Sequence, residues 1–219
     1  MPKAPALVLS SGGLHSLVTA GLAAREHRIA MLHVQDGRST SRQAAGAFAK
    51  QVAHFKPLKA WSLDAPFFRQ MSLPPETASL VHATGSDQHA GLIPTRELQF
   101  LSLAAGYAKQ IHATAIFWGV QFEQKQSEHL SRNIELVQIM NQMLELLSPE
   151  APLVVKTPLM GLDDHQVIEL GYQIGAPFSA TWTCQMGAEF PCMSCSACAR
   201  RIRSFRAAQL NDPLVIKTK

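Results

Sequence analysis

Long apolar runs, aromatic residues and a large excess of one charge are all scarce in this chain of 219 residues. No apolar run reaches the roughly 18 residues that a membrane-spanning helix needs, so we expect no contact with a membrane. The first residues also lack the layout of a secretory signal, which predicts a cytoplasmic protein. Charged residues make up only 16% and hydrophobic residues 47%, a balance that excludes a disordered chain. The net charge of +4 comes without any Lys/Arg block, which argues against a general nucleic-acid surface.

Cysteine is absent from most of the chain and then occurs four times in the pattern C-x7-C-x2-C-x2-C. In a reducing compartment this crowding favours a metal ion over two disulfides. Tetrahedral Zn²⁺ fits four thiolates and would be structural, because no coordination position stays open. An iron–sulfur cluster uses the same ligands and remains an alternative. A helix starting near the third cysteine would present the last two on one turn, capped by Ser194 or Ser196. The predicted ligands are Cys184, Cys192, Cys195 and Cys198.

Apolar strands and amphipathic helices alternate along the chain. We expect strands at 6–10, 29–34, 60–63, 113–120 and 153–156, and helices at 14–26, 40–55, 95–108, 131–147 and 163–170. Asp163 is well placed as the N-cap of the last helix. The segment 65–94 is rich in proline and glycine, which suits a long loop or lid. The alternation predicts an α/β fold with a doubly wound parallel sheet over residues 1–180 and a small zinc-binding module over 181–219.

A Ser-Gly-Gly loop joins the first expected strand to the first expected helix. Adjacent glycines let backbone N–H groups approach a phosphate, and the start of the helix adds a partial positive charge. The hydroxyls of Ser11 and Ser16 can donate to phosphate oxygens. An ordinary strand-to-helix turn would use the same residues, so the loop alone leaves both readings open. The phosphate-binding residues predicted here are Ser10, Ser11, Gly12, Gly13, Leu14, His15 and Ser16.

Six short motifs follow one another in a specific order, and together they carry a family resemblance. They are Ser11-Gly12-Gly13-Leu14-His15-Ser16, Ile93-Pro94-Thr95-Arg96, Phe100-Leu101-Ser102, Gly119-Val120, Thr157-Pro158-Leu159-Met160, and Thr183-Cys184 with the three later cysteines. With these motifs the chain resembles the 7-cyano-7-deazaguanine synthases, the QueC family of PP-loop ATP pyrophosphatases, over nearly its whole length.

The resemblance implies a fold of the adenine nucleotide alpha hydrolase-like (HUP) type, with ATP over the loop at 10–16 and Mg²⁺ as a cofactor. It implies that a carboxylated 7-deazaguanine is adenylated, that pyrophosphate leaves, and that ammonia displaces AMP. A second activation then dehydrates the amide to a nitrile, 7-cyano-7-deazaguanine. Arg96 is the candidate phosphate clamp, because a guanidinium pairs well with phosphate. A homodimer is compatible with this reading.

The chain departs from the family pattern at candidate functional positions. His15 replaces the aspartate of S-G-G-x-D-S, Glu97 replaces an asparagine, and Asp164 replaces a lysine. The segment 121–126 matches the usual acidic, tyrosine-containing segment poorly, and 35–38 differs from Y-G-Q-R. Imidazole is a poor ligand for Mg²⁺. We therefore expect either that Asp36, with Glu97 in reserve, directs the ion, or that His15 itself bonds a phosphate oxygen. The candidate catalytic residues are Arg96, His15 and Asp36.

These departures leave two alternatives beside the family reaction. In the first, the activated deazapurine is joined to an amine of a protein or nucleic acid. In the second, the chain is a catalytically silent nucleotide or deazapurine binder. Outside the site, we expect Arg200, Arg201, Arg203 and Arg206 to form a solvated helix face, and His82 and His89 to be exposed loop residues.

Overall fold

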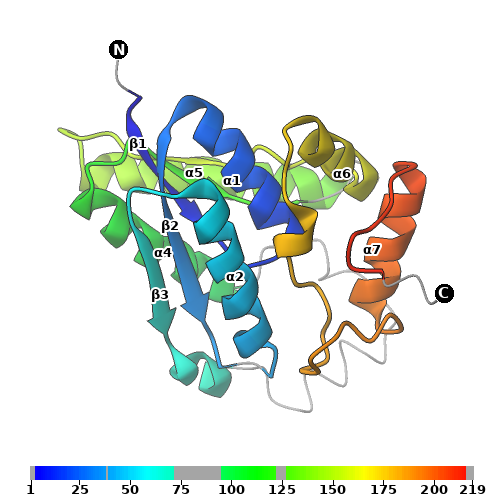
Figure 1. Cartoon of the computed structure of the whole chain (residues 1–219). Helices are drawn as coiled ribbons and strands as arrows, with labels where there is room; N and C mark the ends of the chain where they lie inside the picture. The colour runs from blue at the N-terminus through cyan, green and yellow to red at the C-terminus, as the bar shows by residue number, and fades with distance from the viewer. Residues whose placement is uncertain (1–2, 38, 72–94, 122–126, 216–219) are drawn as a thin grey trace.

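The computed structural model describes residues 3–37, 39–71, 95–121 and 127–215, and its centre is a five-stranded sheet (Figure 1). All pairings are parallel, and the strand order is β3-β2-β1-β4-β5. In the central strand, Leu7 lies opposite Ala30 of β2 and Ile116 of β4. The strands are β1 (Pro5–Leu9), β2 (Arg28–Gln35), β3 (Ala60–Asp64), β4 (Ala115–Trp118) and β5 (Val154–Lys156).

Helices cover both faces of this sheet. Alternate side chains of β1 point to opposite faces, so that Leu7 and Leu9 join one core while Ala6 and Val8 join the other. The first core is closed by α4 (Thr95–Gln110) and α5 (Ser127–Leu147), and the second by α1 (Leu14–Glu26) and α2 (Ser41–Phe55). Burial on both faces explains why the inner strands are almost wholly apolar. The predicted doubly wound parallel sheet is confirmed.

Most expected elements are present, with shifted ends. The strand expected at 113–120 is limited to the four residues of β4, and α5 begins about one turn before residue 131. The segment expected to be irregular opens with a 3₁₀ helix (Pro66–Met71), while 72–94, including His82 and His89, lies outside the described residues. Asp163 is the N-cap of α6 (Asp164–Gln173), as predicted, and its N–H donates to Gln166 Oε1 at 2.8 Å.

The C-terminal part of the chain packs against α1 and α6. Phe205 on α7 (Ser196–Ala207) meets Phe178 edge-on within a core shared with both helices. The backbone N–H of Trp182 donates to Gly12 O at 3.0 Å, which connects this segment to the loop before α1. The helix starts near Cys195 as predicted, but the expected serine cap is wrong: Cys195 is the N-cap, without a side-chain cap bond. The domain boundary at residue 180 stays a prediction.

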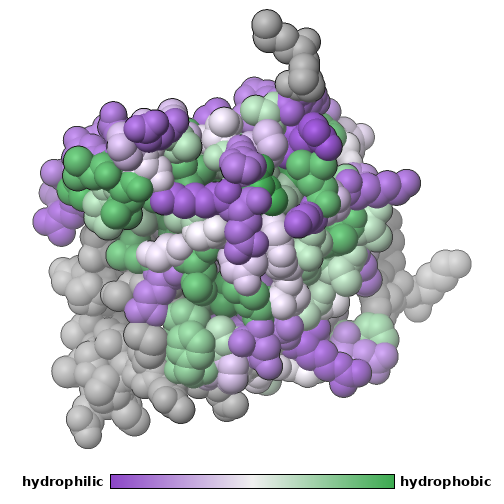
Figure 2. All heavy atoms as spheres, turned by 90° about the vertical axis from the view of Figure 1, so that its left-hand side faces the viewer, coloured by the Kyte–Doolittle hydropathy of each residue, from purple (hydrophilic) through white to green (hydrophobic). Residues whose placement is uncertain are grey.

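The surface carries scattered apolar side chains. Within the described ranges, no helix is long and apolar enough to cross a membrane. On α5 the side chains of Ile139, Met143, Leu146 and Leu147 are exposed. Figure 2 shows, on one face of the molecule, several apolar patches separated by polar side chains. The expected homodimer stays a prediction.

A buried ion pair fixes the C-terminal segment to the helix before it. Arg201 Nε lies 2.6 Å from Asp212 Oδ2, and the two side chains are only 5% and 4% exposed. A second bond joins Arg201 Nη2 to Asp212 Oδ1 at 2.8 Å, and Arg201 Nη1 also donates to Thr181 Oγ1 at 2.7 Å. The expectation of a wholly solvated arginine face on α7 is therefore wrong for Arg201, although Arg203 and Arg206 are exposed.

We expect Arg201→Met to lower the free energy of unfolding by about 3 kcal/mol, because it leaves Asp212 buried without its charged partner. Arg203→Met, the same change on the exposed side of α7, should stay within about 0.5 kcal/mol of the wild type. Urea unfolding measures both. The double variant Arg201→Met/Asp212→Leu should recover part of the loss. Equal stability of the two single variants would show that the pair contributes nothing.

Candidate functional site

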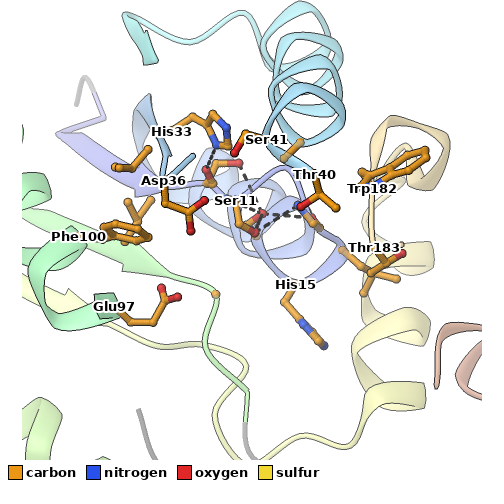
Figure 3. Close-up of a pocket in the computed structure, with 18 of the residues that line it drawn as sticks. Ser11, His15, His33, Asp36, Thr40, Ser41, Glu97, Phe100, Trp182 and Thr183 are labelled. Atoms are coloured by element: carbon orange, nitrogen blue, oxygen red, sulfur yellow. Dashed lines mark hydrogen bonds between the residues drawn. The ribbon is translucent and has the colours of Figure 1, made fainter. Parts of the chain in front are cut away.

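A cavity of about 410 Å³ opens at the carboxyl ends of β1, β2 and β4 (Figure 3). From β1 the chain continues to β2, which pairs with one edge of β1, and it later returns to β4, which pairs with the other edge. The cavity therefore lies where the strand order reverses. Open parallel sheets bind ligands at this position. Its walls include Ser10, Ser11, Gly13, Leu14, His15, Ser16, His33, Asp36, Thr40, Ser41, Glu97, Phe100, Trp118, Gly119, Trp182 and Thr183.

The Ser-Gly-Gly loop forms one wall, and its backbone is fixed by its own hydroxyls. Ser16 Oγ donates to Gly13 O at 3.1 Å and accepts from Ser11 N at 3.3 Å. Gly12 has a φ of 76°, and a Cβ there would lie 2.4 Å from Ala44 O, so only glycine fits. The first turn of α1 contains no acidic residue. Its unpaired N–H groups therefore present a partial positive charge at the cavity.

The end of β4 packs directly against this loop. A Cβ on Gly119 would lie 2.9 Å from Ser16 N and 3.0 Å from His15 O. The Gly-Val motif after β4 is thus explained by close approach of two backbones rather than by a functional side chain. The loop is confined between β4 and α2, and its shape is set before any ligand binds.

Buried polar bonds hold the start of the loop, and sequence reasoning missed them. Ser10 Oγ donates to Gln51 Oε1 at 3.0 Å, and Gln51 Nε2 donates to Ala180 O at 3.0 Å. His33 Nδ1 lies 2.8 Å from Ser10 O, and its ring stacks on Phe48 with centroids 5.1 Å apart. Nothing in the local pattern marks Gln51, a polar residue on a helix, as fully buried. Its role follows only from partners 41 and 129 residues away in the chain.

Two carboxylates line the same cavity. Asp36 follows β2 and is 4% exposed, while Glu97 stands in the first turn of α4. In Figure 3 the Asp36 carboxylate points into the cavity toward Ser11. The backbone of Arg96 belongs to α4, but its side chain lies outside the described residues, as do Arg38 and the segment 122–126. The structure therefore brings Asp36 and Glu97 to the loop and does not place the predicted arginine clamp.

Two residues that depart from the family pattern, His15 and Asp164, contact each other. His15 Nε2 lies 3.2 Å from Asp164 Oδ1, joining the first turn of α1 to the start of α6. Asp164 is 15% exposed, and burial alone would raise its pKa. Hydrogen bonds from His15 and Arg200 outweigh this effect and hold the pKa of Asp164 well below its usual range. Asp164 is therefore an ionised carboxylate at neutral pH.

Arg200 extends this cluster into the C-terminal segment. Its Nη2 donates to Asp164 Oδ1 at 2.8 Å and to Gln121 Oε1 at 2.9 Å, and its Nε donates to Asp164 Oδ2. Gln121 Nε2 in turn donates to Leu162 O. Sequence reasoning assigned Arg200 to a solvated face. The opposite charge of Asp164 was the only sequence feature that could have indicated this ion pair, but 36 residues separate the two partners.

The four cysteines converge at the start of α7. Their sulfurs all lie within 4.8 Å of one another, and Cys192 Sγ is 4.0 Å from Cys198 Sγ. Four thiolates around tetrahedral zinc would stand roughly 3.8 Å apart, given Zn–S bonds of about 2.3 Å. Backbone N–H groups also point at the sulfurs, from Cys192 to Cys184 Sγ at 3.4 Å and from Cys195 to Cys192 Sγ at 3.3 Å. The cluster can hold a metal ion.

The ionisation of the thiols differs across the cluster. Hydrogen bonds from Ser194 and Cys195 lower the pKa of Cys192 to about 6, whereas burial raises the pKa of Cys198 to about 12. A buried thiol resists ionisation until a cation compensates its charge. Hydrogen bonding thus favours the thiolate at Cys192 and Cys195, whereas burial opposes it at Cys198.

Comparisons with known proteins agree with these features. The family model described as "Queuosine biosynthesis protein QueC" matches residues 5–209. A 7-cyano-7-deazaguanine synthase of Chlorobium luteolum is 30% identical over 216 residues, covering 95% of both chains. That of Chlorobium chlorochromatii is 30% identical over 98% of this chain and 96% of its own, and that of Koribacter versatilis is 29% identical over 95% and 92%.

Likeness to solved structures is weaker. NMN synthetase from Francisella tularensis aligns with 96% of this chain and 79% of its own at 12% identity, with a TM-score of 0.47, too low to carry an argument. The family match spans nearly the whole chain, from β1 to beyond α7, and includes the cavity loop and the four cysteines. The chain belongs to the QueC family.

Proposed function

We propose that this protein is an ATP-dependent enzyme that activates a carboxylated 7-deazapurine for attack by ammonia, as in 7-cyano-7-deazaguanine synthesis. One observation carries the proposal: a chain of the QueC family keeps a preformed glycine loop and helix start at the carboxyl ends of the central strands. The curated relatives, matched over almost their whole length, are named 7-cyano-7-deazaguanine synthase.

The proposed chemistry uses the loop for the phosphates. First-turn N–H groups of α1 and the hydroxyl of Ser11 donate to phosphate oxygens, with the Arg96 guanidinium as clamp. The Ser16 hydroxyl can join them only by giving up its bond to Gly13 O. The carboxylate oxygen of the deazapurine attacks the α-phosphorus, and pyrophosphate leaves. Ammonia then attacks the acyl carbon, and AMP leaves with the C–O bonding pair. A second ATP activates the amide oxygen, whose loss gives the nitrile. Positioning and charge stabilisation supply most of the rate enhancement.

Magnesium fits the oxygen ligands present at the cavity. Asp36 and Glu97 provide carboxylates, which Mg²⁺ prefers over imidazole. We assign Asp36 as the first candidate ligand, because its carboxylate points toward the phosphate loop in Figure 3, and Glu97 as the reserve. The ion would neutralise phosphate charge when bound.

Zinc fits the four-cysteine cluster. The sulfurs stand close to tetrahedral spacing, and the N–H···S bonds favour thiolates. Four protein ligands leave no position for a substrate, so the ion would have a structural role: to hold the first turn of α7. Zinc is therefore the proposed metal of the C-terminal segment.

ATP, Mg²⁺, 7-carboxy-7-deazaguanine and ammonium should together yield pyrophosphate and 7-cyano-7-deazaguanine, measured by coupled assay and mass spectrometry. Gly13→Val should reduce this turnover at least tenfold, because its side chain occupies the path of the phosphates. The new Cβ would lie 3.1 Å from Ser11 Oγ, a tight contact that requires a small shift of this side chain, and 3.8 Å from Trp182 O. We expect the variant to fold, which its melting temperature checks. Gly46→Val, on the open surface of α2, is the matched control and should behave like the wild type.

The same assay separates the alternatives. Pyrophosphate release that leads to conjugation with a protein or nucleic-acid amine, and not to the nitrile, favours the first alternative. ATP binding by calorimetry without pyrophosphate release under any of these conditions favours a silent binder. Asp36→Asn should raise the magnesium concentration needed for half-maximal turnover; an unchanged requirement would remove Asp36 as a ligand.

Elemental analysis of the purified protein should find about one zinc per chain. Cys195→Ser should lose the ion and lower the melting temperature, because metal binding and local folding are linked. Ser196→Ala, also beside it in the chain, is the control and should keep the zinc, because the Ser196 hydroxyl donates to Gln185 and not to a cysteine. Iron together with sulfide, or full retention of zinc by Cys195→Ser, would contradict the assignment.

A further inference from the structure

The hydrogen bonds around Asp164 determine which nitrogen of His15 carries a proton. Asp164 Oδ1 accepts from His15 Nε2 at 3.2 Å and from Arg200 Nη2 at 2.8 Å, and Oδ2 accepts from Arg200 Nε. An ionised carboxylate can only accept hydrogen bonds. His15 Nε2 must therefore be the donating nitrogen, so a neutral ring carries its lone pair on Nδ1.

The second nitrogen of this ring belongs to a side chain that lines the cavity. The His15 side chain is 32% exposed, and within the described part of the chain Nδ1 makes no hydrogen bond. The ring stands in the first turn of α1, beside the loop proposed to bind ATP. Asp164 restrains the ring through Nε2, and Arg200 holds Asp164 in place. The cluster thus holds an imidazole at the cavity wall, bonded through one nitrogen and with the other without a partner among the described residues.

Arg200 supplies one positive charge against the one negative charge of Asp164, in a two-bonded arrangement. The carboxylate is thus already paired with a cation, and its bond to His15 fixes which ring nitrogen donates. A neutral His15 can accept a proton at Nδ1, which is what a general base requires.

We propose that His15 is the general base that takes a proton from the attacking nitrogen nucleophile, with Asp164 and Arg200 as positioning residues. The inference rests on the proposed function and deepens it. The nitrogen lone pair forms a bond to the acyl carbon of the acyl-adenylate, and the C–O bond to AMP breaks. AMP leaves with the bonding pair, and one N–H proton passes to His15 Nδ1. With ammonia as nucleophile the product is the primary amide.

The first test needs no substrate. In ¹⁵N-histidine-labelled protein at pH 8, the His15 signals, assigned with His15→Gln, should show a neutral ring with hydrogen on Nε2. Arg203→Gln, an exposed change on α7, should leave that pattern intact, whereas Asp164→Leu should disturb it. Hydrogen on Nδ1, or a ring that stays doubly protonated at pH 8, would overturn the proposal.

The second test measures pyrophosphate release and amide formation separately by rapid quench. In His15→Ala we expect amide formation per adenylate formed to fall about 100-fold, within the range of general-base effects. Added imidazole should restore it, and this rescue should rise with pH as free imidazole loses its proton. Asp164→Asn should lower the amide step less than His15→Ala, and rescue by imidazole should be absent.

The outcomes distinguish the base from the proposed function. If the wild type releases no pyrophosphate with a carboxylated deazapurine, both the proposed function and the general-base role of His15 are contradicted. If pyrophosphate release is normal and amide formation does not depend on His15, only the general-base role is contradicted. A loss of both steps in parallel, or rescue that follows the imidazolium form, would instead make His15 a phosphate ligand. The charged groups near the ring are Asp164 and Arg200, with Asp36 and Glu97 on the same cavity. The pH profile of Arg203→Gln, an exposed change outside the cavity, serves as the control.

Discussion

The burial of β1 on both faces is the constraint on which the site depends. Its side chains fill two separate cores, and its neighbours β2 and β4 bond it on both edges. The strand therefore cannot shift in register without exposing one core. Because Ser10 follows directly, the loop that closes the cavity starts from the most constrained strand of the sheet. Gln51 and His33 extend that constraint through Ser10.

The fold was largely predictable because its signals are local. Short apolar strands, helices with buried faces and an Asp163 cap are visible within windows of about ten residues. The ends of elements were less predictable: β4 is short because Gly119 must pass close to His15 and Ser16, a contact between distant segments. The loop, the cysteines and Asp36 were found from spacing and position. Arg200, Arg201 and Gln51 were not, because their partners lie far away in the chain.

The departures from the family pattern are connected rather than independent. His15 and Asp164 seem unrelated when they are compared with the family position by position, since 149 residues separate them. In the fold they form one bonded pair, so a change at either position alters the surroundings of the other. An anion at position 15 would face the ionised Asp164, and a lysine at 164 would face Arg200. In this chain the two positions supply a donor and an acceptor to one hydrogen bond.

Helix α7 carries three attachments within about one turn. Cys198 points to the cysteine cluster, Arg200 reaches Asp164 and Arg201 reaches the buried Asp212. Each added residue rotates a helix by about 100°. An insertion or deletion of one residue after Cys198 would thus turn both guanidinium groups away from their carboxylates. The length of the stretch from Cys195 to Arg201 is therefore as constrained as the identity of its bonded residues.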